Sequence, residues 1–205
     1  WKFEERLSKE FEAVGFFISD HPLNQFKDYF YDYKIINYQT FTNSDDIKNS
    51  NIAATLLKIQ ERKTAKGNSY AILKLTDLSS VFELFIFSDL LDLNREILKE
   101  GNSLILNVIK STSDDQNRFK RVSIQKIGSL SELINKPIKE VTFDIKTEKQ
   151  LDEISNFLSK NGETLVNIVF QKDDKNLIFQ LENKRNLDRK TLNLIRNKEI
   201  SATIS

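Results

Sequence analysis

The chain has 205 residues, of which 39% are hydrophobic and 30% are charged, and its formal net charge is +1. This composition is ordinary for a soluble globular protein, and no apolar run approaches the roughly 20 residues that a membrane span requires. The chain has no cysteine and a single histidine, which excludes disulfides and thiolate metal sites and speaks against a Ser-His-Asp catalytic set. We therefore expect a cytoplasmic protein with no metal or cofactor in this chain, and its start at Trp1 without any methionine indicates a fragment of a longer protein.

Positive charge is concentrated in two separate segments. Residues 51–76 carry five basic and one acidic side chain, and residues 110–126 carry five basic and two acidic ones. Residues 1–50, with six basic and nine acidic side chains, and residues 81–100, with two basic and five acidic ones, are net negative. A polyanion could use both basic segments if the fold brings them together.

The first predicted element is a helix over residues 3–14. Its apolar residues recur with the spacing of one helical face, and Gly15 is suited to end it. The apolar positions are Leu7, Phe11 and Val14.

A second helix is predicted from the stretch "GFFISDHPL". Ser19 or Asp20 is the expected N-cap, with Pro22 in the first turn, and we expect His21 to cap or pack rather than to transfer protons. Residues 40–50 are rich in Ser, Thr, Asn and Asp, which favours a loop and a module boundary. The buried stripe of the second helix is predicted at Leu23, Phe26 and Phe30.

From residue 51 to 128 the apolar pattern takes the period of two that is typical of strands. One helix, with Ser88 as N-cap and Gly101 at its end, interrupts the strands. Three strands, a helix and two strands form the element order of a five-stranded Greek-key barrel, the OB-fold. The predicted strands cover residues 52–62, 70–76, 81–87, 103–111 and 118–127.

The remaining residues predict a β-α-β-β-α-β order, which is typical of a ferredoxin-like domain with a split βαβ unit. The predicted fold class is therefore α+β and mostly β, in three parts. These parts are a helical linker segment at residues 1–50, an OB-fold nucleic-acid-binding domain at 51–128 and a small α+β domain at 129–205.

In an OB-fold, strands two and three and the loops after strands one and four form the ligand face. Both basic segments fall in these loops, so they would line one groove together with nearby aromatic side chains. Cations neutralise phosphates, and an exposed aromatic ring can stack a base for roughly 1 to 3 kcal/mol. The candidate nucleic-acid-binding residues are Arg62, Lys63, Lys66, Asn68, Tyr70, Phe85, Arg118, Phe119, Lys120 and Arg121, with Phe87 as a further stacking face.

A purely structural interpretation of these residues stays open. Successive side chains of the third strand point to opposite sides, so either Phe85 and Phe87 or their neighbours belong to the barrel core. Basic hairpin tips are also commonly only solvated. Three pairs of adjacent aspartates fall in predicted polar turns rather than on rigid elements, so we expect no metal site there.

Two motifs resemble the alpha subunit of bacterial DNA polymerase III. "EFEAVGFFISDHPL", residues 10–23, resembles the segment after the fingers region, and "KIQERKTAKGNSYAILKLTDLSSVFELFIF", residues 58–87, is similar to the barrel of that family. The residues from Val141 onward are similar to its C-terminal domain. The chain departs from the family pattern where Asp20, and the pair Ser79 and Ser80, replace glycines.

This resemblance implies a C-terminal fragment that is itself non-catalytic. The polymerase palm with its Mg²⁺ ions and the peptide that binds the sliding clamp would lie upstream. The barrel would contact single-stranded template DNA through the matching turn residues, and the C-terminal domain would bind the tau subunit of the clamp loader. Two alternatives remain: an anticodon-binding barrel of an aminoacyl-tRNA synthetase, and a protein-interaction scaffold without nucleic-acid binding. The matching turn residues are Arg62, Lys63, Lys66 and Asn68.

Overall fold

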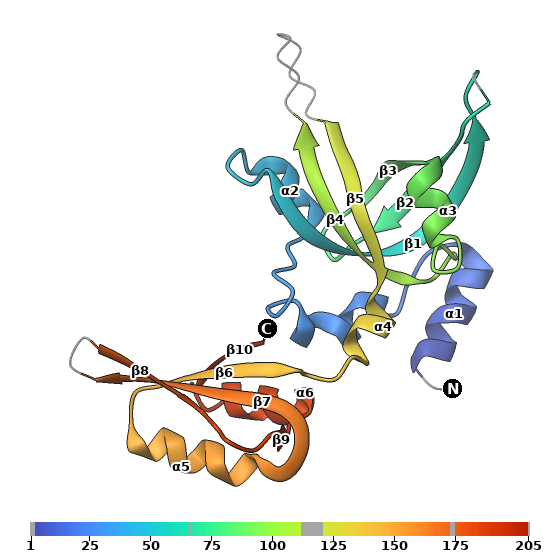
Figure 1. The fold of residues 1–205 in the computed structure, drawn as a ribbon. Coiled ribbons are helices and arrows are strands. Elements are labelled where there is room, and N and C mark those ends of the chain that lie inside the picture. Colours follow the sequence, from blue (N-terminus) through green and yellow to red (C-terminus); the bar gives the residue numbers. More distant parts are fainter. Residues whose placement is uncertain (1–2, 66, 112–120, 173–174, 205) are drawn as a thin grey trace. The chain divides into compact units, whose positions relative to one another are not determined.

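The computed structural model describes residues 3–65, 67–111, 121–172 and 175–204. The chain divides into two compact units, Trp1–Ile134 and Asn135–Ser205. Over the described residues it is mostly β, with a small N-terminal helical part and two sheets (Figure 1). The predicted fold class is therefore confirmed at this level.

The first helix, α1 (Phe3–Val14), has the predicted bounds. Gly15 ends it in the left-handed conformation, with φ at +77°, and its N–H donates to the carbonyl of Phe11 at 2.8 Å. Of the predicted apolar face, Leu7 is buried but Val14 is 48% exposed. The predicted face is therefore buried at Leu7 and exposed at the end of the helix.

The second helix, η1 (Pro22–Tyr29), is a 3₁₀ helix, and its N-cap is His21. The Nδ1 atom of His21 accepts a hydrogen bond from the N–H of Leu23 at 3.1 Å. The prediction of Ser19 or Asp20 as the cap was wrong, because the Asp20 carboxylate instead accepts from the backbone N–H of His21 at 2.7 Å. The expected capping role of the histidine is confirmed.

Part of the predicted loop at residues 40–50 is helical. The helix α2 (Tyr38–Asn43) is capped by Asn37, whose side chain accepts a hydrogen bond from the N–H of Thr40. Phe41 in this helix is completely buried in the core of the first sheet. Burial of that ring holds a helical turn that the polar composition of the segment disfavours.

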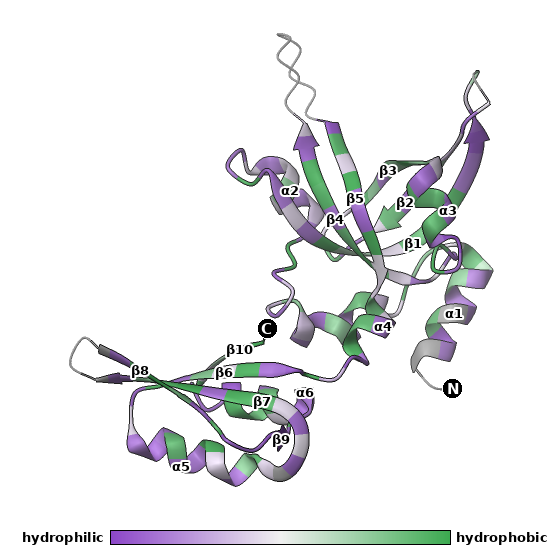
Figure 2. Ribbon diagram, viewed as in Figure 1, coloured by the Kyte–Doolittle hydropathy of each residue, from purple (hydrophilic) through white to green (hydrophobic). Residues whose placement is uncertain are grey.

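The first sheet contains five antiparallel strands in the order β3-β2-β1-β4-β5. Its two edge strands, β3 and β5, also contact each other, so the sheet curls around one core of inward side chains. Figure 2 shows hydrophobic residues interspersed with hydrophilic ones along β4 and β5, and along β3 buried and exposed residues alternate strictly, as expected when one face is buried. The strands are β1 (Asn49–Lys63), β2 (Ser69–Thr76), β3 (Val81–Phe87), β4 (Ser103–Ser111) and β5 (Arg121–Ser129).

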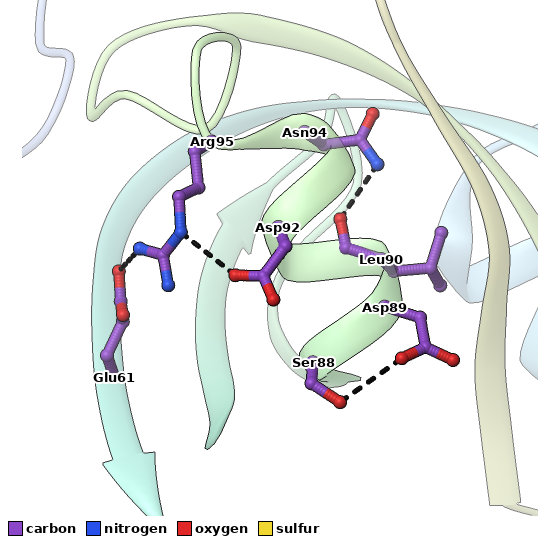
Figure 3. Close-up of polar contacts among 7 residues, drawn as sticks. All are labelled: Glu61, Ser88, Asp89, Leu90, Asp92, Asn94 and Arg95. Carbon is purple, nitrogen blue, oxygen red and sulfur yellow. Dashed lines mark hydrogen bonds and ion pairs between the residues drawn. The ribbon is translucent and has the colours of Figure 1, made fainter. Parts of the chain in front are cut away.

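The helix α3 (Ser88–Asn94) lies between β3 and β4 in the chain, as predicted, but it is shorter than expected. Ser88 was wrongly predicted as the N-cap, because that position is held by Phe87 and has no side-chain cap bond. At the other end, the side-chain amide of Asn94 donates to the carbonyl of Leu90 at 2.8 Å (Figure 3). This bond satisfies a carbonyl of the last turn.

β1 is covered on both faces near its middle and is mostly exposed toward its end. Residues 52–57 are all buried. On the outer side, Ala53 packs against Leu23 and Phe26 of η1 and against Leu130 of the short helix α4 (Leu130–Ile134). A β-bulge lies between Leu56 and Lys58. Beyond it, the outer face of the strand is open.

The second unit has the predicted element order with one additional short strand, β9, which pairs with β7. Its main sheet runs β10-β6-β7-β8. The predicted split βαβ unit is corrected, because β6 and β7 pair directly and in parallel, from Glu140 with Leu165 to Ile145 with Phe170. β8 pairs with the other edge of β7, so no strand lies between the parallel pair. The elements are β6 (Glu140–Ile145), α5 (Glu148–Phe157), β7 (Ser159–Lys172), β8 (Lys175–Gln180), β9 (Arg185–Asn186), α6 (Arg189–Arg196) and β10 (Ser201–Ile204).

Candidate nucleic-acid interface

The open outer face of β1, β2 and β3 carries three rows of paired side chains, here called the outer-face rows. Residues directly opposite each other on antiparallel strands point to the same face, with their Cβ atoms about 4.5 to 5.5 Å apart. Each row therefore crosses three strands. The rows are Arg62, Tyr70 and Phe87; Gln60, Ile72 and Phe85; and Lys58, Lys74 and Glu83.

The aromatic side chains of these rows are accessible. Phe85 and Phe87 are 46% and 57% exposed, whereas Leu84 and Ile86 between them are buried. Tyr70 is half-buried. The alternation on β3 therefore assigns Phe85 and Phe87 to the outer face and leaves their neighbours to the core.

Arg121, the first residue of β5, lies beside the first row. The Cζ atom of its guanidinium is 5.9 Å from the centroid of the Phe87 ring. A cation at this distance from a ring face is attracted by the ring quadrupole. Because Arg62 occupies the other end of the same row, the row of Tyr70 and Phe87 lies between arginines from the two basic segments.

The turn after β1 is held by its own backbone and by one hydroxyl. The N–H of Thr64 donates to the carbonyl of Asn68 at 2.9 Å, and the Oγ1 of Thr64 accepts from the N–H of Asn68 at 3.1 Å. Gly67 has φ at +83°, a conformation that glycine adopts without steric cost. Lys63 and Asn68 are exposed on either side of this turn.

Six of the ten predicted site residues lie in the described part of the chain. Arg62, Tyr70, Phe85 and Arg121 gather at the outer-face rows, while Lys63 and Asn68 lie at the adjacent turn. The contact of each with nucleic acid stays a prediction. The predicted residues outside the described ranges are Lys66, Arg118, Phe119 and Lys120.

Sequence reasoning missed two cations of the interface. Lys58 and Lys74 are exposed and directly paired in the third row, with Glu83 beside Lys74. Their shared face depends on the pairing register and on the bulge before Lys58. The period of two along each strand was the available signal, but it does not show which residues are opposite each other.

Glu61, the acidic residue of the basic segment 51–76, faces away from the outer-face rows. Glu61 accepts a hydrogen bond from Nη1 of Arg95 at 2.7 Å, and Nε of Arg95 donates to Asp92 at 3.1 Å (Figure 3). The hydrogen bonds that Arg95 donates to Glu61 and, with a smaller effect, to Asp92 raise the pKa of Arg95. The carboxylate of Glu61 is therefore paired with the residue that follows α3 instead of neutralising Arg62.

The side chain of Asp77 holds the turn between β2 and β3, in which Ser79 and Ser80 take the place of the expected glycine. The Oδ1 atom of the buried Asp77 accepts hydrogen bonds at 2.8 Å from the N–H and hydroxyl of Ser79 and from the N–H of Ser80. Neither serine has a positive φ. Because this turn needs no left-handed residue, the departure from the family pattern is compatible with a tight hairpin.

His21 lies close to the same turn. Its Nε2 is 3.4 Å from the Oγ1 of Thr76, and its Nδ1 is occupied by the cap bond to Leu23. Burial lowers the pKa of His21, although the carboxylates of Asp77 and Asp20 oppose the shift. The neutral imidazole is therefore favoured, as its capping role requires.

Among the described residues, no group of three or more His, Asp and Glu side chains could hold a metal ion. In the same part of the chain, no helix is long and apolar enough to cross a membrane. What the outer-face rows offer is cations, stacking surfaces and amide groups. That set is suited to binding a chain of phosphates and bases.

No protein-family model matches the chain, but several named proteins are similar to it. It is 29% identical over 156 residues to the DNA polymerase III subunit alpha of Rickettsia conorii, covering 73% of this chain and 13% of that protein. The corresponding protein of Rickettsia prowazekii is 33% identical over 93 residues, covering 44% of this chain and 7% of the relative. The corresponding protein of Halalkalibacterium halodurans is 24% identical over 180 residues, covering 84% of this chain and 16% of that protein.

The alignments with the proteins of Rickettsia conorii and Halalkalibacterium halodurans extend over most of the chain, but the chain spans only 13% and 16% of these relatives. The resemblance predicted from the two motifs is confirmed. Over most of its length, the chain is similar to a part of the alpha subunit of bacterial DNA polymerase III.

Proposed function

We propose that the chain is a C-terminal part of a bacterial replicative DNA polymerase and that its OB-fold holds single-stranded template DNA on the outer-face rows. The observation that carries this proposal is the placement of Tyr70 and Phe87 between Arg62 and Arg121. Bases would stack on the exposed rings while the arginines neutralise neighbouring phosphates. Because every base has a π-face, such a surface accepts any template sequence.

The polymerase activity itself belongs in this proposal to other parts of the parent protein. The chain corresponds to only 13% of the relative from Rickettsia conorii. The catalytic carboxylates, their Mg²⁺ ions and the contact with the sliding clamp would lie elsewhere in that larger chain. The parent protein would work in the cytoplasm, where bacterial DNA is replicated.

A salt titration tests the DNA-binding proposal. Binding of fluorescent oligo-dT, followed by anisotropy, should weaken log-linearly with salt, with a slope of about −0.7 for each neutralised phosphate. The double variant Arg62→Ala/Arg121→Ala should bind more weakly and lose about 1.4 from this slope. Absent binding, or a flat salt dependence, would favour a protein-interaction scaffold instead.

A charge-matched control separates a local site from general attraction. Lys99→Ala/Lys190→Ala also removes two exposed positive charges, but neither lysine belongs to the outer-face rows. This control should bind oligo-dT as the unaltered chain does. Equal losses in both double variants would contradict the proposed site, and stronger binding of a tRNA than of oligo-dT would favour the anticodon-binding alternative.

The second unit is proposed to recruit the tau subunit of the clamp loader. The support is the similarity to polymerase alpha subunits, which in one alignment extends over 84% of the chain, together with the separate core of the second unit. The 205-residue chain should capture purified tau in a pull-down assay, whereas residues 1–134 should not. If residues 1–134 also captured tau, the contact with tau would lie in the first unit.

A further inference from the structure

The helices of the second unit leave one end of its sheet uncovered. α5 packs against β6 and α6 packs against β10, while β8 forms the opposite edge of the sheet. A sheet normally buries its apolar face against another layer of structure. On β8, however, Leu177 and Phe179 are 45% and 53% exposed.

These two side chains belong to the core face of the sheet. Phe179 pairs with Ile168 and Leu177 pairs with Phe170 across β7, and directly opposite residues share a face. Ile168 is buried in the core of the unit, and Phe170 packs against that core. Leu177 and Phe179 therefore extend the apolar surface beyond the part that the helices cover.

An apolar groove of about 220 Å³ adjoins this surface. Ile168, the pairing partner of Phe179, forms part of its floor. Leu151, which lies on α5 and is 41% exposed, forms part of its wall. The groove is lined chiefly by Leu151, Ile154, Leu158, Ile168, Leu181 and Arg185.

Arg185 places one buried hydrogen-bond donor in this apolar groove. Its Nη1 atom is buried, and no hydrogen-bond acceptor for it lies among the described residues. An unpaired buried donor is unfavourable, and a carboxylate is the acceptor that a guanidinium binds most strongly. A ligand that matches the groove therefore combines apolar side chains with one carboxylate.

We propose that an amphipathic helix of a partner protein lies beside α5, over β8. Its apolar side chains would fill the groove and cover Leu177 and Phe179, and one Asp or Glu would pair with Arg185. Such a helix would complete the helical layer on this face of the sheet. The inference rests on the proposed recruitment of a replisome partner by the second unit, and it adds the chemistry of that contact.

The test uses the 205-residue chain and a phage-displayed library of short helix-forming peptides as the probe. Selected peptides should share apolar residues three or four positions apart and an Asp or Glu. Phe179→Ser and Leu151→Ser should each weaken binding of a synthetic selected peptide about tenfold or more, as expected for central contacts. Ile178→Ser is the matched control, because Ile178 is 72% exposed but lies on the opposite face of β8.

The carboxylate is tested by a double-variant comparison. Arg185→Gln should weaken binding of the selected peptide, but it should have no further effect on a peptide in which the acidic residue is replaced by its amide. Selection of no such peptides, or equal losses with Phe179→Ser and Ile178→Ser, would overturn the proposal. Dimerisation of the chain that disappears in Phe179→Ser would also overturn it, since the occupant would then be a second copy.

The outcome for tau separates this inference from the proposed function. If Phe179→Ser still captures tau as well as the unaltered chain does, the groove is not the recruiting surface, although recruitment itself stands. If peptides bind the groove with the expected sensitivities but tau is not captured, recruitment of tau is wrong and the groove assignment stands.

Discussion

The guanidinium of Arg121 lies over the ring of Phe87, with 5.9 Å between its Cζ atom and the ring centroid. The contact joins the start of β5 to the end of β3, which are the two edge strands of the first sheet. It brings the second basic segment to the aromatic side chains that follow the first. Electrostatic attraction and base stacking are therefore available at one place on the sheet.

Loss of either exposed phenylalanine should weaken DNA binding without unfolding the chain. Phe85→Ala and Phe87→Ala each remove a stacking face worth about 1 to 3 kcal/mol, or roughly 5- to 150-fold in affinity for oligo-dT. Val81→Ala is the control, because Val81 is on the same face of β3 and, like Phe87, is 57% exposed. Anisotropy should show no change for this control. Equal losses of affinity in the three variants would show that the phenylalanine rings are not part of the binding site.

The two lysines of the third row should contribute through charge alone. Lys58→Ala and Lys74→Ala are each expected to make the salt slope of oligo-dT binding shallower by about 0.7. Glu83→Gln should strengthen binding, because it removes a negative charge beside Lys74. An unchanged slope in both lysine variants would show that phosphates do not reach this row.

The first unit should lose stability as the solution becomes acidic through His21. Burial holds the pKa of His21 below its ordinary value of 6.5, so the unfolded chain binds the proton first. The free energy of unfolding should be highest above pH 6.5 and fall as the pH decreases through the lowered pKa of the folded state. Urea titrations followed by circular dichroism at several pH values measure this change.

His21→Asn is the matched control for that experiment. Asparagine also caps helices but does not titrate, so the variant should lose part of the acid sensitivity. His21→Ala should in addition lose about 1 kcal/mol at neutral pH, because the N–H of Leu23 loses its acceptor. Acid sensitivity that is identical in His21→Asn would assign the effect to other groups.

Gly162 is required for the approach of two backbones in the second unit. A Cβ atom at this position would lie 2.1 Å from backbone atoms of Arg185 and Asn186, so Gly162→Ala must displace β9 from β7. We expect a loss of about 1 to 3 kcal/mol in the free energy of unfolding of this unit, as for other overpacked sites. Asn161→Gly, next to it, should be neutral or stabilising, because Asn161 has φ at +70°. A neutral Gly162→Ala would mean that β9 is not held where the structure has it.

Local pattern was sufficient for much of the fold. The alternation along residues 81–87 predicted the bounds of β3 and divided its side chains between two faces, but only the structure shows that Phe82 and Leu84 are buried while Phe85 is exposed. Apolar spacing also predicted most of the element order, although the short elements α2, α4 and β9 were not predicted. These features depend on neighbours in sequence, which is why one sequence is enough to predict them.

Features that depend on distant partners were not predictable in the same way. β6 pairs directly with β7, and the apolar pattern of the strands does not show which strands are neighbours in the sheet. His21 caps η1 in place of Asp20, because the Asp20 carboxylate accepts a hydrogen bond from the N–H of His21. The pairing of Lys58 with Lys74, which adds two cations to the interface, arises from the register of β1 against β2.

The single extra residue in β1 decides which chemistry the sheet offers to a ligand. Side chains of a strand alternate strictly, so the irregularity between Leu56 and Lys58 resets the alternation for everything that follows it. If the strand alternated through Leu57 without this irregularity, Ile59 and Glu61 would face outward and Lys58 and Arg62 would face the core. One bulged residue therefore gives the outer face of this sheet a cationic surface in place of an acidic and apolar one.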